Sequence, residues 1–427
     1  MAISLSSSYL LTLFLTITAA VLRLPTPTHS ATHHSDVQLL KQLKRTIAPS
    51  TIPPGSCIDS WDFTLDPCDN LFSDKFTCGL RCNSSSAAAA ARVTELSLDP
   101  AGYSGSLAAV PWAAAPYLQI LDLSDNNFSG PIPDSLSALT RLRRLGLSGN
   151  SLSGPIPDSL GSLAGLEEMC LDRNNLTGTV PSSLNGLANL KRLEIQGNRL
   201  GAEFPDLSRL GELSFLDASD NAISGGIPAA LPPSLVEIAM RNNQLQGNIP
   251  AGLVANSAFL QVMDLSHNKL AGSIPASLFA HPSLEQLTLS YNQFGSIETP
   301  GDSVLGSQLI SVDLSNNQIH GFLPGFMGQM TRLSALSLEN NQFSGLIPTQ
   351  YVLKVLGHGA AQFERLLLGG NYLYGPIPGE FLGLKAGSVM VQLGDNCLYR
   401  CPVRWFFCEG GEQKSLNECR AFGPIIP

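Results

Sequence analysis

Cysteines are the residues whose chemistry is easiest to assign in this chain of 427 residues. Eight of the nine form two groups of four, one near each end of the sequence: Cys57, Cys68, Cys78 and Cys82, then Cys397, Cys401, Cys408 and Cys419. Each even group can close two disulfides in three connectivities, and the spacing leaves the connectivity open. Four cysteines can also bind zinc, but neither group contains two CxxC knuckles. The sequence therefore predicts two disulfide-stapled regions.

The ninth cysteine, Cys170, stands apart from both groups. It follows Met169 and precedes Leu171 in a predicted strand, so the alternation of side chains should turn it toward solvent. Three states are open: a free thiol, an intermolecular disulfide, or a buried cysteine that its neighbours shield. We favour the buried cysteine.

No catalytic constellation emerges from the sequence. The GxSxG, HExxH, Walker A and dinucleotide-binding glycine patterns are absent. The seven histidines do not cluster with metal-ligand spacing. Asp264 and His267 share one predicted strand and could touch, but the pattern places no nucleophile beside them. The sequence predicts a protein that is not an enzyme and has no metal site and no cofactor.

The overall charge excludes further classes of partner. Lys and Arg number 25 against 34 Asp and Glu, a net charge of −9, and no basic block is present. Nucleic-acid binding needs a basic footprint. A surface that grips anionic lipid needs the same. We therefore expect no nucleic-acid partner and no anionic membrane surface.

The N-terminal segment predicts secretion. Residues 9–22 form an apolar, uncharged run of about 14 residues, which suits a signal peptide and is shorter than the roughly 20 residues of a spanning helix. We expect a signal peptide over residues 1–30. No Lys or Arg precedes the run, so an uncleaved anchor is the alternative. No later stretch reaches 18 apolar residues, so we expect no direct membrane span.

An internal repeat supplies the elements that position these residues. The pattern Leu121-x-Leu123-x-x-Asn126 recurs around a series of further asparagines, mostly 24 or 25 residues apart. These are Asn150, Asn174, Asn198, Asn221, Asn243, Asn268, Asn292, Asn317, Asn341, Asn371 and Asn396, and a degenerate first copy has Ala101 in that place. The period is that of a leucine-rich repeat, in about 13 coils.

Each position of the repeat has a physical role. The paired leucines alternate along a short strand and point into the core, while the residue between them points outward. The asparagine can bond backbone groups of the turn that would otherwise be buried and unpaired. Stacked coils share one core, so the sequence predicts an α/β leucine-rich-repeat solenoid with a concave parallel β-sheet.

Both ends of such a solenoid need caps. We expect a cysteine-rich cap over residues 31–92, repeats over 93–396 and a second cap over 397–427. Residues 36–46 should form an amphipathic helix behind Ser35 as N-cap. Trp405, Phe406 and Phe407 should cover the last coil. About six extra residues within 349–361 predict a short helix or a bulge on the convex side.

The repeat LxxLxLxxNxLxGxIPxxL resembles the plant-type extracellular leucine-rich-repeat family. The two cysteine-rich caps are similar to those of short, kinase-less receptor-like proteins and to the ectodomains of receptor kinases. The resemblance implies a right-handed superhelix that binds a peptide, a protein or a partner receptor, including a receptor kinase ectodomain. It implies an extracellular location, in the apoplast or cell wall or at the plasma membrane surface through a partner. This sequence lacks the family's kinase.

The middle coils depart most from the consensus on the predicted concave face. They place acids, arginines and one aromatic on neighbouring strands, which suits an extended, partly basic peptide or a protein loop. We predict a ligand-binding patch of Glu168, Asp172, Arg173, Arg192, Glu194, Phe215, Asp217, Glu237 and Arg241, with Asp172 and Arg173 on the strand of Glu168. The other interpretation is an ordinary solvated strand face.

Three sequons, Asn83, Asn127 and Asn175, predict N-glycosylation. Two functions fit the sequence as a whole. The first is a secreted interaction module in plant signalling or defence. The alternative, drawn from the same family, is a polygalacturonase-inhibitor-like protein that blocks a secreted hydrolase. The acid-rich concave face favours the first, because the inhibitor should present a basic stripe.

Overall fold

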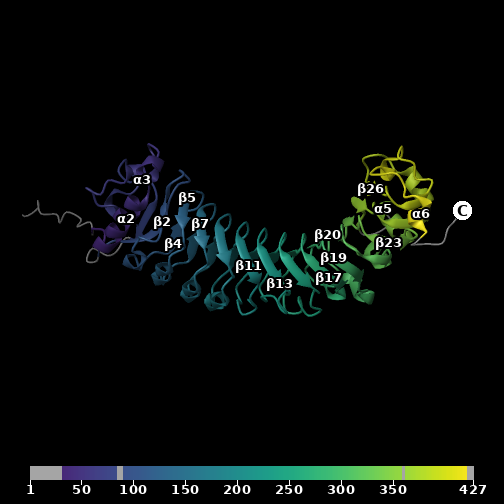
Figure 1. Ribbon diagram of the computed structural model, residues 1–427, viewed down its shortest axis with the longest axis horizontal. Coiled ribbons are helices and arrows are strands. Elements are labelled where there is room, and N and C mark those ends of the chain that lie inside the picture. The colour runs from purple at the N-terminus through teal and green to yellow at the C-terminus, as the bar shows by residue number, and fades with distance from the viewer. Residues whose placement is uncertain (1–30, 84–89, 358–360, 421–427) are drawn as a thin grey trace, which may run out of the picture.

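Stacked coils form a curved solenoid with a cap at each end (Figure 1). The computed structural model describes residues 31–83, 90–357 and 361–420. The predicted signal peptide lies outside these residues. The short helices run along the outer side of the arc, and the longest sheet forms its concave face (Figure 1). No helix of the described ranges is long and apolar enough to cross a membrane.

The concave sheet has 14 strands in chain order. Its first strand, β1 (Leu80–Asn83), runs antiparallel to β2 (Arg92–Ser97), and all later neighbours are parallel. The remaining strands are β4 (Ile120–Asp122), β6 (Arg144–Gly146), β8 (Glu168–Cys170), β10 (Arg192–Glu194), β12 (Phe215–Asp217), β14 (Glu237–Ala239), β16 (Val262–Asp264), β18 (Gln286–Thr288), β20 (Ser311–Asp313), β22 (Ala335–Ser337), β24 (Arg365–Leu367) and β26 (Met390–Gln392).

Two further parallel sheets, here called the lateral sheets, follow the turn of each coil. The first has nine strands: β3 (Ser104–Ser106), β5 (Asn127–Gly130), β7 (Ser151–Gly154), β9 (Asn175–Gly178), β11 (Arg199–Glu203), β13 (Ala222–Gly225), β15 (Gln244–Gly247), β17 (Lys269–Ile274) and β19 (Gln293–Ile297). The second has four: β21 (His320–Phe322), β23 (Gln342–Gly345), β25 (Tyr372–Pro376) and β27 (Cys397–Tyr399). The glycines of the repeat, such as Gly345 at φ +91°, occur at backbone angles that side chains rarely adopt.

Helices are few and short outside the N-terminal cap. The α-helices are α2 (His34–Thr46), α3 (Cys57–Ser60), α4 (Ala276–Phe279), α5 (Thr349–Val355) and α6 (Leu416–Cys419). Single 3₁₀ turns complete the coils and caps: η1 (Pro49–Thr51), η2 (Cys68–Asn70), η3 (Trp112–Ala114), η4 (Asp134–Ala138), η5 (Asp158–Ser162), η6 (Ser182–Gly186), η7 (Gly301–Gly306), η8 (Gly325–Gly328), η9 (Gly379–Gly383) and η10 (Phe406–Cys408).

The repeat asparagines form a continuous hydrogen-bonded ladder. Asn243 is typical: its Nδ2 donates to the carbonyl oxygens of Met240 and Arg241 in its own turn and of Ala218 in the preceding coil, at 3.0–3.2 Å. Its Oδ1 accepts from the amide of Ile223 in that preceding coil, at 3.0 Å. This one side chain thus forms hydrogen bonds with a backbone amide and with backbone carbonyls that are buried in the core, away from water.

The ladder is closed at the C-terminal end by a glutamine. Asn396 is the last repeat asparagine, and beyond it the amide of Leu398 donates to Gln413 Oε1 at 2.9 Å. Gln413 Nε2 donates to the carbonyl of Leu393 at 3.3 Å. These partners occupy the same places relative to Asn396 that Ile223 and Ala218 occupy relative to Asn221. Gln413 therefore supplies the rung that a further coil would have contributed.

The disulfides pair cysteines within each cap. The bonds are Cys57–Cys78 and Cys68–Cys82 at the N-terminal end, and Cys397–Cys419 and Cys401–Cys408 at the C-terminal end. This geometry excludes the zinc alternative for both groups. In the C-terminal cap Phe407 is buried, and Trp405 and Phe406 pack against the core, as predicted.

Two local expectations are settled by the structure. The prediction that Ser35 caps the first helix was wrong: α2 begins at His34, and His33 Nδ1 accepts from the Ser35 amide. The extra residues before the eleventh asparagine, Asn371, form α5, the short helix that was one of two alternatives. Tyr351 of α5 is buried and donates through its hydroxyl to the carbonyl of Pro324, at 3.1 Å.

We predict that Asn243→Ala lowers the free energy of unfolding by about 1–3 kcal/mol. The substitution leaves the Ile223 amide unpaired in the core, which carries that cost, whereas the Ala218 carbonyl still accepts from Asn221 Nδ2 at 3.2 Å. Urea unfolding followed by far-UV circular dichroism measures the change. Gln246→Ala on the exposed face of β15 is the control and should be close to neutral. Equal destabilisation by both variants would contradict the role assigned to the ladder.

Candidate functional site

The concave strands β8, β10, β12 and β14 bring the predicted patch together. Their register aligns Glu168, Arg192, Phe215 and Glu237 in one row and Cys170, Glu194, Asp217 and Ala239 in a second row. The residues between the rows are buried. Neighbouring strands lie about 4.8 Å apart, so each side chain in a row can contact the side chain beside it on the next coil.

An arginine stacked on an aromatic ring occupies the centre of the patch. The guanidinium carbon of Arg192 lies 3.8 Å from the centroid of the Phe215 ring, close enough for a cation–π interaction. The Nε of the same side chain contacts the carboxylate of Glu194. Arg192 is therefore held over the Phe215 ring, and both side chains remain partly exposed.

The acids beside this stack are poorly neutralised. Within the described residues Glu237 makes no ion pair, and Asp217 accepts from the amide of Ser219 at 2.9 Å. Burial and the neighbouring Asp217 carboxylate raise the pKa of Glu237 above its ordinary value, and Arg192 opposes this shift. A cationic group placed between Asp217 and Glu237 would relieve their repulsion.

Three predicted members of the patch lie in turns. The prediction that Asp172 and Arg173 continue the strand was wrong, because β8 ends at Cys170 and Arg173 has φ +52°. Asp172 is only 4% exposed, accepts from the Ser148 hydroxyl and pairs with Arg173 at 3.0 Å. The Asp172 carboxylate is therefore already engaged by groups of the protein itself. Arg241 likewise follows β14.

The two turn arginines form ion pairs at the rim of the concave sheet. Arg173 contacts Asp125 at 3.1 Å, and Arg241 contacts Asp220 at 3.4 Å. About half of each of these four side chains is exposed to solvent. Each pair therefore contributes little to stability and can exchange partners. They flank the two rows rather than form them.

Arg144 is a member of the site that the prediction missed. From β6 it contacts Glu168 at 2.5 Å and Asp122 at 3.3 Å, and so extends the charged surface by one coil. A hollow of about 470 Å³ beside it is lined by Gln119, Arg141, Arg143, Gly165, Glu167 and Asn189. The run Arg141-Leu-Arg143-Arg144 was the available signal, but only the coil-to-coil register shows which acids these arginines meet.

Cys170 is unpaired and buried, the outcome that the sequence favoured. It is 7% exposed although it lies in the outward row of β8. Burial raises the pKa of its thiol to about 12, and the Glu194 carboxylate adds to the shift. The thiol is therefore protonated at neutral pH and contributes a small apolar surface beneath the patch.

Asp264 and His267 do not form a pair. Asp264 ends β16 and accepts from the amide and hydroxyl of Ser266, at 2.9 and 2.6 Å. His267 lies in the following turn and stacks on Tyr291, with ring centroids 4.2 Å apart and an interplanar angle of 12°. The predicted contact was wrong, because β16 ends at Asp264 and His267 lies in the turn that follows.

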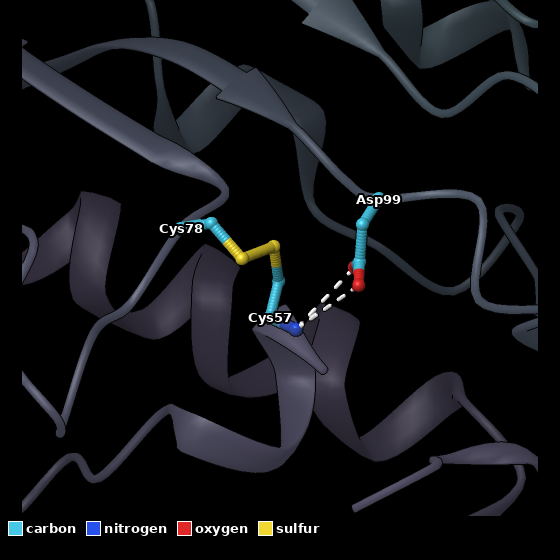
Figure 2. A group of neighbouring side chains, drawn as sticks. All are labelled: Cys57, Cys78 and Asp99. Atoms are coloured by element: carbon cyan, nitrogen blue, oxygen red, sulfur yellow. Dashed lines mark hydrogen bonds between the residues drawn. A yellow bond between two sulfur atoms is a disulfide. The ribbon is translucent and has the colours of Figure 1, made fainter. Parts of the chain in front are cut away.

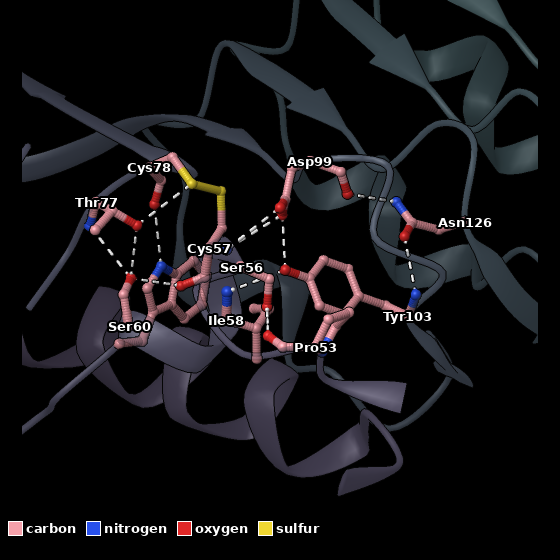
Figure 3. The surroundings of a disulfide bond; sticks show 11 residues. Pro53, Ser56, Cys57, Ile58, Ser60, Thr77, Cys78, Asp99, Tyr103 and Asn126 are labelled. Carbon is pink, nitrogen blue, oxygen red and sulfur yellow. Dashed lines mark hydrogen bonds between the residues drawn. A yellow bond between two sulfur atoms is a disulfide. The ribbon is translucent and has the colours of Figure 1, made fainter. Parts of the chain in front are cut away.

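Among the described residues, Cys57, Cys78 and Asp99 are close enough to suggest a metal site (Figure 2). The two sulfurs are bonded to each other, so neither is a thiolate ligand. The Asp99 carboxylate accepts from the Cys57 amide at 3.3 Å and from the Tyr103 hydroxyl at 2.6 Å (Figure 3). Tyr103 in turn accepts from the Ile58 amide, and burial raises its pKa to about 12. The group fastens the N-terminal cap to the first coil.

The three sequon asparagines lie at exposed positions. Asn127 begins β5 and Asn175 begins β9, both in the nine-stranded lateral sheet. Asn83 ends β1, and the rest of its sequon lies outside the described residues. Glycans on Asn127 and Asn175 would project from the N-terminal half of the lateral surface.

We predict that Asp217→Asn lowers the pKa of Glu237. Removing the neighbouring negative charge removes one of the causes that raise this pKa. Carboxyl-selective NMR titration measures it. Asp264→Asn serves as the matched control, because Asp264 is not among the groups that shift Glu237. A Glu237 pKa unchanged by Asp217→Asn would show that burial alone accounts for the shift.

We predict slow alkylation of Cys170 in the native protein. A thiol pKa of about 12 leaves on the order of 1,000-fold less thiolate at pH 8 than an ordinary cysteine has. Iodoacetamide labelling followed by intact mass measures the rate, with urea-unfolded protein as the reference. Labelling of the native protein at the unfolded rate would contradict the burial described here.

Comparisons with known proteins agree with this architecture. The leucine-rich repeat family model matches residues 117–139, 141–163, 165–187, 259–280 and 308–330. No curated protein matches the chain. The plant peptide hormone receptor RGFR1 in complex with RGF2 is 28% identical with a TM-score of 0.62, covering 75% of this chain and 50% of that one.

Two further structures define how far the likeness extends. A TDR receptor is 25% identical with a TM-score of 0.58, covering 73% of this chain and 57% of that one. The leucine-rich-repeat protein LIC12759 of Leptospira interrogans is 25% identical with a TM-score of 0.54, covering 73% and 76%. This chain spans about half the length of the two receptor structures. Its repeats and sheet order are those of a leucine-rich-repeat solenoid, and its fold is similar to that of these two plant receptors and of the bacterial protein.

Proposed function

We propose that this chain is a secreted, ligand-binding leucine-rich-repeat module of plant signalling or defence. Its ligand is an extended peptide or protein segment, and a receptor kinase ectodomain is its natural partner. The structural likeness to a plant peptide hormone receptor supports a ligand-binding scaffold. Because a similar solenoid occurs in a bacterial protein, the fold alone does not carry the function. The argument rests on the concave patch.

The observation that carries the proposal is the acidic pair Asp217 and Glu237 beside the partly exposed Phe215 ring. Strands β4 to β14 present five carboxylates and two guanidinium groups toward the concave side: Asp122, Glu168, Glu194, Asp217 and Glu237, with Arg144 and Arg192. Both guanidinium groups already contact acids or the Phe215 ring. The uncompensated charge is therefore negative and lies over β12 and β14.

This arrangement selects a ligand with a cationic group next to an apolar one. A Lys, Arg or N-terminal ammonium of the ligand would lie between Asp217 and Glu237. An adjacent apolar side chain would pack against Phe215, where aromatic anchors contribute most to interfaces. A ligand spanning several strands of about 4.8 Å spacing must be extended, which favours a peptide over a small metabolite.

Binding should strengthen as pH rises through the pKa of Glu237. The raised pKa means that part of the Glu237 population is protonated above pH 4.5, the ordinary value. A bound cation favours the ionised carboxylate, so binding lowers this pKa and releases a proton. Affinity is then weakest at the acidic end of the range and reaches its plateau once Glu237 is ionised.

Glycans belong to the same proposal. Attachment at Asn83, Asn127 and Asn175 would shield the first coils and leave the concave rows open. A partner receptor would then approach from the later coils.

The test uses the mature protein as bait in extracellular fluid and solubilised plasma membrane, with mass spectrometry of the captured partners. We expect a basic peptide or a receptor kinase ectodomain. Capture should fall at least tenfold with Asp217→Arg and with Phe215→Ala. Glu380→Arg makes the same charge change on the exposed η9 turn and should leave capture unchanged.

Two results would overturn the proposal. Capture that survives both concave substitutions would remove the ligand from this patch. Recovery of a polygalacturonase or a similar secreted hydrolase would instead support the inhibitor function.

A further inference from the structure

The last strand of the concave sheet, β26, has a partly open edge at the C-terminal end of the arc (Figure 1). From β2 to β24, the carbonyl two residues before the central apolar residue of each strand accepts an amide of the next coil. For β24 this carbonyl belongs to Glu364, which accepts from the Met390 amide at 2.9 Å. The equivalent carbonyl of the last coil is that of Val389. It has no partner within the described residues.

Val391 has both of its backbone groups on the same open edge. The Met390 amide is bonded to the preceding coil, and the Gln392 carbonyl likewise accepts from the Leu368 amide there, at 2.9 Å. Backbone groups of successive strand residues point to opposite sides, so the N–H and C=O of Val391 point away from β24. In the part of the chain that the structure describes, neither group meets a partner on that side.

The C-terminal cap closes only the end of this edge. The Leu393 amide points away from β24 as well, and it donates to the Phe407 carbonyl of the cap at 2.7 Å. Before Phe407 the cap does not continue alongside β26, because it forms the 3₁₀ turn η10, in which the Trp405 carbonyl accepts from the Cys408 amide at 2.7 Å. The edge before Leu393 is therefore left without a neighbouring strand.

A hollow of about 650 Å³ follows this part of the edge, a size within the roughly 300–1,000 Å³ typical of ligand sites. Val389 and Val391 line it, together with Phe406, Glu409 and Gly410 of the cap. The two valines are only 5% and 3% exposed. Backbone groups withdrawn from solvent in this way need a partner, and the hollow is the space in which a partner can lie.

The side chains around the hollow are apolar and acidic. Met390 is 56% exposed, and Phe406 packs against the core with part of its ring accessible. Glu364 and Glu409 also line the hollow, both are exposed, and neither forms an ion pair within the described residues. No Lys or Arg is among the lining residues. A matching occupant has an extended backbone, an apolar side chain and a positive charge.

We infer that β26 binds an extended, basic segment of a partner protein, which joins the concave sheet as a further strand. In this mode of recognition backbone hydrogen bonds provide affinity and side-chain contacts provide specificity. The Val391 amide donates to the segment, and the carbonyls of Val389 and Val391 accept from it. A lysine or arginine of the segment meets Glu364 or Glu409.

This surface is separate from the patch around Asp217 and Glu237. Along the sheet, β14 and β26 are six strand spacings apart, or about 29 Å. A substitution at the hollow should therefore leave capture through Asp217 and Phe215 unchanged, so the two proposals can fail independently.

N-methylated peptides test the backbone pairing without altering the protein. The probe is the acetylated and amidated peptide VKVKV, and its affinity for the full chain is measured by isothermal titration calorimetry. One variant carries N-methyl groups on its valines and the other on its lysines, so each blocks the donors of one edge of the extended probe. We expect one variant to bind at least tenfold more weakly than the probe and the other to bind within twofold of it.

Three results of this comparison would overturn the inference. Equal affinity of all three peptides would show that no edge of the probe is bonded. Equal loss in both variants would show that the probe does not bind as a strand along one edge. Failure of the unmethylated probe to bind would remove the ligand altogether.

A charge reversal places the probe in the hollow. Glu409→Lys should weaken binding of VKVKV at least fivefold, because it replaces a carboxylate of the lining by a cation. Glu380→Lys makes the same change on the exposed η9 turn and should leave binding unchanged. Equal weakening by both substitutions would show only a general attraction to an acidic protein.

Hydrogen exchange of single amides reports on the edge directly. Without the probe, the Val391 amide should exchange at least tenfold faster than the Leu393 amide, which is bonded to Phe407. Saturating VKVKV should slow Val391 at least tenfold and leave Leu393 unchanged. A Val391 amide that is as slow as Leu393 before the probe is added would show that water or the cap already satisfies it, and the inference would be wrong.

Discussion

The asparagine ladder is the constraint on which the rest of this structure depends. Each rung satisfies groups of two successive coils, so no coil can be removed without leaving buried donors and acceptors unpaired. The same constraint requires that each end of the solenoid provide partners for the buried backbone groups of its last coil. At the N-terminal end, where Ala101 replaces the asparagine, Asp99 and Tyr103 accept the amides of Cys57 and Ile58. At the other end Gln413 completes the last rung.

Because the ladder and the leucines fix the interior, the outward positions are free to vary. Leu193 and Leu216 are buried in the same way, yet the residues that flank them range from Arg192 to Phe215. The concave rows can therefore hold repelling carboxylates at little cost to folding.

The features that recur in every coil could be predicted from the sequence. The contacts between side chains of neighbouring coils could not. The LxLxxN spacing was enough for the strands, the ladder and the outward rows. It could not show that the Asp172 carboxylate meets the Ser148 hydroxyl, because β8 ends at Cys170, three residues before the predicted end of the strand. It also could not show Arg144 between Asp122 and Glu168, since those contacts join residues 22 and 24 positions apart. Disulfide pairing required the folded caps.

The two outward surfaces differ in how the side chains of neighbouring coils meet, and this difference follows from their geometry. On the concave face the strands pair residue for residue, so charged side chains of adjacent coils stand in rows, and the Asp217 carboxylate helps to raise the pKa of Glu237. On the lateral sheets some side chains instead lie over a glycine of the next coil, as Glu203 does over Gly225, Phe322 over Gly345 and Leu346 over Gly375. The concave face is thus suited to recognise charge, because its register fixes which charged side chains stand side by side.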